Sequence, residues 1–92
     1  MSNASDDVLA ERERQKNVEG WTARHDDEHE DNQLAIAAAS YAAWGEKRTP
    51  PLIWPWGERW WKPRDHRRNC VKAAALLIAE IERLDRASQK GA

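Results

Sequence analysis

The sequence contains no phenylalanine, only one cysteine and no long apolar run. A single cysteine excludes an internal disulfide framework and fits a reducing compartment, and we expect Cys70 to be a small packed hydrophobe rather than a reactive thiol. No stretch approaches the roughly 20 apolar residues that a membrane span needs, and no signal peptide is recognisable. We therefore expect a cytoplasmic protein without a membrane partner.

Large aliphatic side chains are also scarce, because many of the hydrophobic residues are alanine. At 92 residues the chain is near the size at which one core is only just sufficient. The six tryptophans must therefore supply much of the buried area. We expect one helical domain over residues 1–92, with residues 1–5 flexible or tag-derived and residues 88–92 a flexible tail. A homodimer would relieve so thin a core, and we expect one.

The net charge of −1 conceals an uneven distribution of charge along the chain. Residues 1–32 hold ten acids and four bases, whereas residues 45–72 hold eight bases and three acids. This asymmetry indicates either two faces, one of which attracts anions, or two halves that neutralise each other in the fold. Because the overall charge is negative and no basic recognition helix stands clear of acids, nucleic-acid binding is disfavoured.

Helical periodicity is the regular pattern of this chain, and we see neither an internal repeat nor strand alternation. Ser5 reads as the N-cap of a first helix that ends near Val18, with its outer acids and bases forming a solvated surface. A second helix is predicted over roughly Gln33–Trp44. A third is expected to begin with Pro63 in its first turn and to run to about Ala87.

The third helix carries an apolar stripe of helical period, which we expect to face the core. The stripe consists of Val71, Ala74, Leu77, Ile78, Ile81 and Leu84. Residues 46–57, with three prolines, exclude a regular helix, yet they contain Leu52, Ile53, Trp54 and Trp56, so this loop should fold back onto the body. The sequence thus predicts an all-α, three-helix compact domain with an ordered Trp/Pro-rich loop before the last helix.

The segment from Trp54 to Arg68 interleaves indole rings with guanidinium and ammonium groups. Indole faces stack on bases while the cations bind phosphates, and the start of the third helix adds N–H groups that favour an anion. The same residues could equally form a core with a solvated basic rim, or anchor a protein partner. We interpret Trp54–Trp56 as a packed loop and Trp60–Arg68 as the better candidate for a working surface.

A second cluster, His25 to His29 with Asp26, Asp27 and Glu28 between, could place both histidines on one helix face. No third ligand cluster is evident, so we expect no metal and no cofactor. Asp26 and Asp27 are better explained as caps or as partners of the third helix's arginines. No catalytic arrangement can be assembled from the sequence, and we expect no enzyme.

Several short motifs, taken in their order along the chain, resemble the repeat domain of ryanodine receptors. That domain also occurs as a small helical domain in bacteria and phages. The motifs are Arg14, Gly20-Trp21-Thr22, Asp26-Asp27, His29, Leu34, Lys62, Asp65, Arg68-Asn69 and the helix from Ala73 to Leu77. The chain departs from the family in Trp54-Pro55-Trp56 and in the doubled Trp60-Trp61. The resemblance implies a nucleotide-linked sensing role, with Trp21, Asp26, Asp27, Lys62, Asp65 and Arg68 near the site. The general character of the sequence is also similar to that of small bacteriophage or prophage accessory proteins.

We therefore expect a non-catalytic module that binds a small phosphorylated ligand, such as a cyclic nucleotide or dinucleotide signal, in the manner of a phage nucleotide sponge or sensor. The alternative is a phage protein that inhibits or adapts a host protein through a Trp/Arg interface, in either case in the host cytoplasm. The predicted base-stacking residues are Trp56, Trp60 or Trp61. The predicted phosphate ligands are Lys62, Arg64, Arg67 and Arg68. Asp26 or Asp27 would orient these cations, and Trp21 and Asp65 complete the predicted site.

Overall fold

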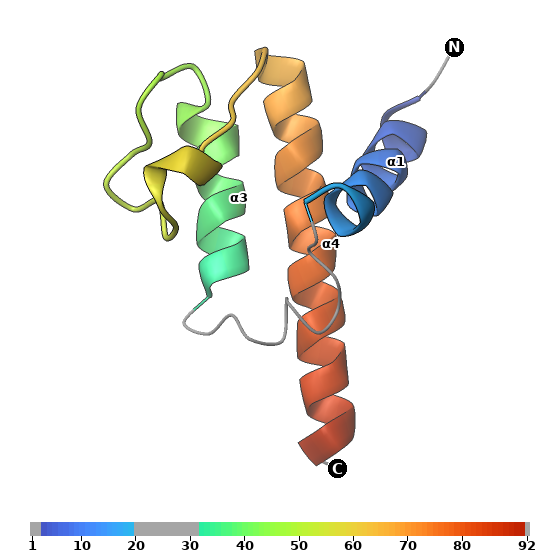
Figure 1. The fold of residues 1–92 in the computed structure, drawn as a ribbon. Helices are drawn as coiled ribbons and strands as arrows, with labels where there is room; N and C mark the ends of the chain where they lie inside the picture. The colour runs from blue at the N-terminus through green and yellow to red at the C-terminus, as the bar shows by residue number, and fades with distance from the viewer. Residues whose placement is uncertain (1–2, 20–31, 92) are drawn as a thin grey trace.

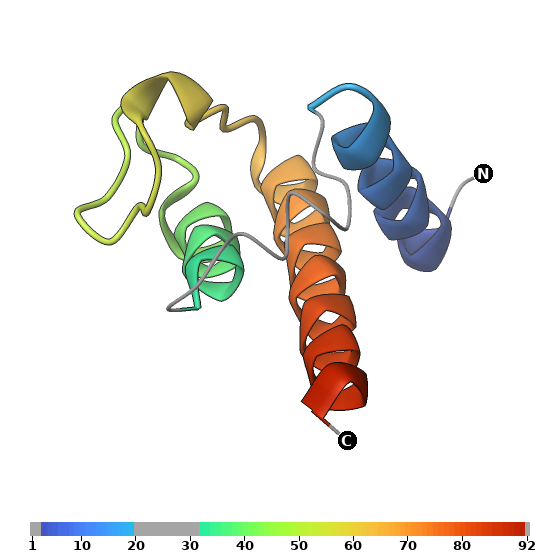
Figure 2. The same ribbon diagram turned by 60° about the horizontal axis from the view of Figure 1, so that its bottom comes forward.

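The computed structural model describes residues 3–19 and 32–91, and these form an all-helical domain with no strand in either range. α4 (His66–Gly91) is the central element, with α3 (Gln33–Trp44) packed antiparallel on one side and α1 (Ala4–Asn17) on the other (Figure 1, Figure 2). The all-α, three-helix prediction is confirmed. In chain order the elements are α1 (Ala4–Asn17), α3 (Gln33–Trp44), the short 3-10 turn η1 (Glu58–Trp60) and α4 (His66–Gly91). None of the helices in the described ranges is long and apolar enough to cross a membrane.

α1 begins one residue before the predicted cap, because Asn3 and not Ser5 caps it. The side chain of Asn3 accepts a hydrogen bond of 2.8 Å from the N–H of Asp6, and asparagine satisfies this end of a helix as well as serine does. The helix ends at Asn17, and Val18 donates its N–H to the carbonyl of Arg14. The end predicted near Val18 is thus confirmed to within one residue.

α1 also corrects the prediction of a solvated outer surface. Glu11, Arg12 and Gln15 are among the most buried residues of the molecule, with exposed fractions of 1%, 4% and 1%. Arg12 reaches Glu82 of α4 at 3.1 Å, and Gln15 points at the backbone of the same helix. α1 therefore packs on α4 through polar side chains, which no apolar periodicity could have indicated.

α3 has the predicted bounds, and its alanines let α4 approach closely. Leu34, Ala37, Ala38 and Tyr41 are buried against α4, opposite Ala73, Leu76 and Ala79 of that helix. Between the helix pair and the loop lies an aromatic cluster. Trp61 stacks on Tyr41 with centroids 4.9 Å apart, and Trp54 meets both rings edge-on at 4.8 and 5.4 Å.

The Trp/Pro-rich loop is ordered against the body through Trp54 as predicted, but Leu52 and Ile53 do not fold back. Both are exposed, Leu52 completely. Trp54 donates its N–H to the carbonyl of Pro51, and the two aliphatic residues lie at the centre of that turn, where side chains point outward. The burial of this loop therefore comes from tryptophan.

α4 begins at His66 rather than in a turn containing Pro63. Asp65 is the cap, accepting the N–H of Arg68 at 3.1 Å. The preceding residues are held extended by Asn69, which accepts from the N–H of Arg64 and donates to its carbonyl. Two reciprocal bonds from one buried amide thus stop the helix from starting earlier.

The apolar stripe on α4 is only partly a core face. Val71 is buried, but Leu77, Ile81 and Leu84 are 45%, 58% and 51% exposed, and Cys70 is exposed as well. α3 and α1 cover the sides of α4 that carry Asn69, Leu76 and Ala75, and no helix of the described residues packs over Leu77, Ile81 and Leu84. The predicted burial of Val71 is confirmed, whereas the predictions that Leu77, Ile81, Leu84 and Cys70 pack inside are wrong.

Candidate functional site

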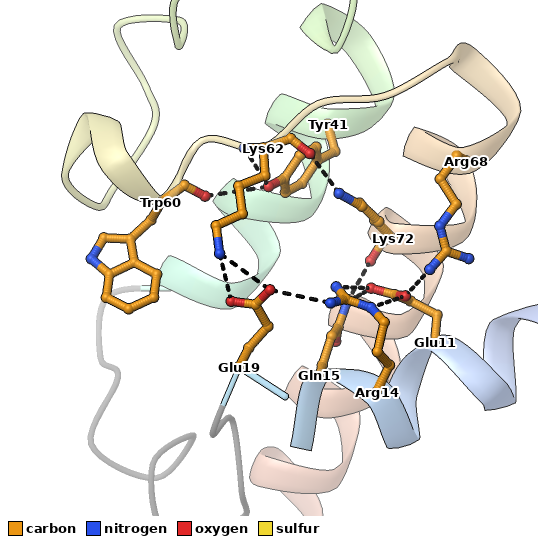
Figure 3. A network of polar contacts seen from close by, with 9 residues as sticks. All are labelled: Glu11, Arg14, Gln15, Glu19, Tyr41, Trp60, Lys62, Arg68 and Lys72. Carbon is orange, nitrogen blue, oxygen red and sulfur yellow. Dashed lines mark hydrogen bonds and ion pairs between the residues drawn. The ribbon is translucent and has the colours of Figure 1, made fainter. Parts of the chain in front are cut away.

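A network of charged side chains joins the end of α1 to the start of α4 (Figure 3). Its centre is Glu11, whose carboxylate accepts two hydrogen bonds from Arg14, at 2.7 and 2.8 Å, and one from Gln15 at 3.1 Å. Arg68 of α4 donates to the same carboxylate. One buried acid therefore binds two arginines from different helices.

Glu19 extends this network across to the chain that precedes α4. Its carboxylate pairs with Arg14 at 3.2 Å and with Lys62 at 3.0 Å. The Nζ of Lys62 also lies 5.6 Å from the centroid of the Trp60 ring, within the range of a cation–π contact. Glu19 thus positions a lysine beside an indole.

Tyr41 and Lys72 bind the backbone of residues 60–62, as the dashed lines in Figure 3 show. The Tyr41 hydroxyl donates to the carbonyl of Trp60 at 3.4 Å and accepts the N–H of Lys62 at 3.1 Å. Lys72 donates its Nζ to the carbonyl of Lys62, and the same Nζ lies 5.3 Å from the Tyr41 ring centroid. The backbone of residues 60–62 is therefore held in place by side chains of α3 and α4.

Above this network is an open cleft of about 480 Å³, which we call the basic cleft. Its lining consists of Arg14, Glu19, Lys62, Arg64, Asp65, Arg68 and Lys72. Five cations face two carboxylates, and both carboxylates are engaged: Glu19 by Arg14 and Lys62, Asp65 by the start of α4. Within the described ranges, neither Arg64 nor Lys72 forms an ion pair with a carboxylate.

Proton affinities in the cleft follow from burial and from these pairs. Burial disfavours the carboxylate of Glu11, but the hydrogen bonds and charge of Arg14, the charge of Arg68 and the bond from Gln15 outweigh it, so its pKa lies below the ordinary 4.5. Burial acts on Glu19 in the same way and is outweighed by Lys62 and Arg14, which lower its pKa. The hydrogen bond to Glu11 raises the pKa of Arg14.

Lys72 shifts in the opposite sense. Burial lowers its pKa from 10.5 to about 8, with Glu11 opposing the shift and the neighbouring arginines adding to it. At neutral pH its ammonium group is still mostly protonated. It donates to the carbonyl of Lys62, and no carboxylate of the described residues forms an ion pair with it. An anion in the basic cleft would compensate that charge.

The structure separates the tryptophans predicted to stack on a base. Trp61 is 6% exposed, and its indole N–H donates to the carbonyl of Lys47, so it belongs to the core and is closed to a ligand. Trp56 packs edge-on against Trp54, and its indole N–H donates to Gln33 at 3.4 Å, away from the cleft. Trp60 is half-buried beside the cleft, where Arg59 and Lys62 lie near its ring.

Among the other predicted residues, Lys62, Arg64, Asp65 and Arg68 come together in the basic cleft. Arg67 does not, because it turns toward α1 and pairs with Asp7 at 2.8 Å. Trp21, Asp26 and Asp27, together with His25 and His29, lie outside the described residues. Over the described ranges, no three metal-ligating side chains gather.

Sequence reasoning left Arg14, Glu19 and Lys72 out of the site. Lys72 follows Arg68 by four residues, so helical spacing alone places both on one side of α4. Arg14 was noted only as a mark of the family, and nothing in its spacing links it to residues more than forty positions away. Glu11, which pairs with Arg14 and Arg68, is one of the acids of the first helix that we expected in a solvated surface, but it is buried.

No protein-family model, no curated protein and no solved structure matches this chain, so its likeness to the ryanodine receptor repeat stays an expectation from the sequence.

Proposed function

We propose that this protein is a non-catalytic module that binds a small phosphorylated ligand in the basic cleft, of the kind represented by nucleotide second messengers. The observation that carries the proposal is the excess of cations over carboxylates in a cleft of about 480 Å³, a volume within the range of small-ligand sites. The phosphate would lie near Arg64, Arg68 and Lys72.

The chemistry of the cleft favours phosphate over a plain carboxylate. Arginine binds phosphate oxygens bidentately, and Arg68 is already oriented by its bond to Glu11, so little side-chain entropy is lost when it binds. Arg64 is exposed, and Asn69 fixes its backbone on both sides, which sets where its side chain starts. A multiply charged anion is the ligand that such a group of cations attracts.

Trp60 would supply the recognition of a base or another planar ring. It is the tryptophan of the described residues that is both partly exposed and next to the cleft, and base stacking on an indole contributes about 1–3 kcal/mol. Arg59 and Lys62 both lie near the Trp60 ring, and Lys62 is held by Glu19, so a stacking base would have to displace at least one of these cations. Such a module would act as a sensor or sponge for its ligand.

Titration with cyclic mononucleotides, cyclic dinucleotides and inorganic phosphate tests the proposal. We expect at least one nucleotide to raise the melting temperature and to change the tryptophan fluorescence, because a ligand of the native state stabilises it. Inorganic phosphate should bind more weakly, since it lacks the ring. No response to any of them at millimolar concentration would contradict the proposal.

Two matched variants locate the site. Arg64→Gln should weaken binding by about tenfold or more, the effect of one charge-assisted hydrogen bond. Arg48→Gln removes the same charge from an exposed position outside the cleft and should leave the affinity within about twofold of wild type. Equal losses in the two variants would indicate attraction by overall charge rather than binding in the cleft.

The alternative, an inhibitor or adaptor of a host protein, is favoured by one observation on the loop. Leu52 and Ile53 are adjacent, aliphatic and exposed at its tip, where a protein partner would bury them. A purified candidate partner should lose binding to Leu52→Ser and retain it with Arg64→Gln. The reverse pattern would assign the interaction to the basic cleft.

A further inference from the structure

α3 is a surface helix without a single charged residue. Its inward side is buried, but its outward positions Ala39, Ala42 and Ala43 are exposed alanines, with Ala35 half-buried beside them. A helix on the surface of a globular protein normally carries charged or polar residues opposite its buried face, and a helix that is apolar on all sides is normally covered. The outward side of α3 therefore has the composition of an interface.

A second, independent apolar surface lies on α4. Leu77, Ile81 and Leu84 are all about half exposed, and they continue an alternating spacing of four and three residues that starts at Cys70 and Ala74. That spacing is the heptad pattern by which one helix presents an apolar seam to another. Nothing in the described part of the monomer covers this seam.

The two surfaces face the same side of the molecule. On α3 the positions that face α4 include Leu34, Ala38 and Tyr41, and on α4 the positions that face α3 include Asn69, Ala73 and Leu76. Ala35, Ala39 and Ala42 each follow one of these α3 residues by one position, and Leu77 follows Leu76, which places them about 100° further around each helix. Ile81 and Leu84 continue from Leu77 on the same side of α4. Because the helices are antiparallel, that step turns both toward the same side of the pair (Figure 1). They form one surface, the α3/α4 face, made up of Ala35, Ala39, Ala42, Leu77, Ile81 and Leu84.

We propose that the α3/α4 face binds a second copy of this chain in a symmetric dimer with a four-helix interface. In a two-fold arrangement each copy presents the same patch, so the patch must complement itself. The α3/α4 face meets that condition, because a ridge of leucine and isoleucine on α4 lies beside a strip of alanine on α3. The ridge of one copy fits over the shallow strip of the other, and no charge on the face opposes the contact.

The size of the face indicates the class of interface that it can form. Twelve residues of α3 span about 18 Å and two adjacent helices about 20 Å, which together with the overhanging turn at Leu84 gives roughly 500 Å² per copy. Stable interfaces bury about 800 Å² per partner, so this dimer belongs to the small, weak class of interfaces.

Dimerisation through this face is independent of ligand binding in the basic cleft. Arg68, which lines the cleft, is nine residues from Leu77, so the two lie half a turn apart on α4 and point to opposite sides. Both clefts of the dimer would stay open. A failure of the nucleotide titrations would therefore leave this proposal standing, and the reverse also holds.

Sedimentation equilibrium of the full chain between about 10 µM and 1 mM tests the proposal. A reductant is needed, because the exposed Cys70 lies at the edge of the face and a disulfide would mimic association. We expect the average mass to rise from 10.6 kDa toward twice that value across this range. A wild-type chain that stays monomeric at 1 mM would overturn the proposal.

Three variants identify the face. Ile81→Arg and Ala39→Glu place a charge in it from different helices, and each should keep the mass at the monomer value up to 1 mM. Both positions are exposed in the monomer, so circular dichroism at 10 µM should show wild-type helicity. Leu52→Arg, at a fully exposed aliphatic residue on the loop, should dimerise as wild type does. Folded face variants that still dimerise would place the interface elsewhere and refute this one.

Discussion

Glu11 carries its charge where only 1% of its surface is exposed. The position is tolerable because Arg14, Gln15 and Arg68 donate hydrogen bonds to its two oxygens, and a buried carboxylate is stable only when it is paired in this way. The same pairing orients the arginines that line the basic cleft. At this residue, stability and the candidate site depend on the same contacts.

Replacing Glu11 should therefore be costly. Glu11→Ala removes the carboxylate partner of Arg68 and leaves Arg14 with Glu19 alone. We expect a loss of about 3 kcal/mol in the free energy of unfolding, the lower end for a broken buried pair, because both arginines are about one-third exposed. Glu13→Ala on the same helix breaks only an exposed pair with Lys16 and should cost less than about 1 kcal/mol. Urea unfolding of the two variants measures the difference. Equal effects would mean that Glu11 contributes no more than a surface charge.

At the scale of the elements, the loop after α3 closes onto α4 through Asn69 and Gly45. The Asn69 amide donates to the carbonyl of Gly45 at 3.1 Å and to that of Arg64 at 2.8 Å, so one side chain fixes both ends of the Trp/Pro-rich segment. Gly45 has an ordinary helical φ of −63°, so its backbone conformation does not require glycine. The close approach of Asn69 does.

Gly45→Ala should consequently destabilise the protein. The added Cβ would lie 2.6 Å from the carbonyl oxygen of Tyr41 and against the Asn69 amide, and relieving the overlap should cost about 1–3 kcal/mol. In Gly57→Ala the nearest atom is Cδ1 of Trp60 at 3.7 Å, so that variant should be neutral or more stable by about 0.5 kcal/mol. Thermal unfolding compares the two. A neutral Gly45→Ala would show that Asn69 can move without loss.

The sequence predicted some elements of the fold better than others, and the differences have physical reasons. The bounds of α3 were correct because its apolar run is bracketed by Asn32 and Gly45, and burial of Trp54 followed from the scarcity of other large side chains. Helical period alone predicted that Leu77 would be buried, but it could not say which sides of α4 neighbouring helices would cover. Four of the seven residues that line the cleft were predicted, because they lie in one short segment from Lys62 to Arg68.

The rest of the cleft could not be predicted because it depends on contacts between distant segments. Glu11 and Arg14 reach Arg68 and the cleft across more than fifty residues of chain. A charged helix with a weak apolar period is normally read as solvent-facing, and only tertiary packing shows that α1 buries its polar side.

For the whole molecule, α4 is held by two interfaces of different chemistry. α3 packs on it through an apolar and aromatic cluster, whereas α1 attaches through ion pairs, among them Arg67 with Asp7 and Arg12 with Glu82. The stability that buried aromatic side chains contribute does not change as the pH falls in the acid range. The α1 pairs need ionised carboxylates, so the two interfaces should fail under different conditions.

We expect acid to detach α1 before the aromatic core opens. The pKa values of Glu11 and Glu19 are lower in the fold than the 4.5 of an unfolded chain, so the stability they contribute is complete above about pH 4.5 and is lost as the pH falls through their folded pKa values. Between pH 4.5 and about 2, amide signals of α1 should lose their dispersion in NMR spectra. The indole N–H signals of Trp54 and Trp61, bonded to the carbonyls of Gly57 and Lys47, should keep their native positions over that range. A single coincident transition would show instead that α1 and the core unfold as one cooperative unit, with the ion pairs transmitting the loss of either helix to the other.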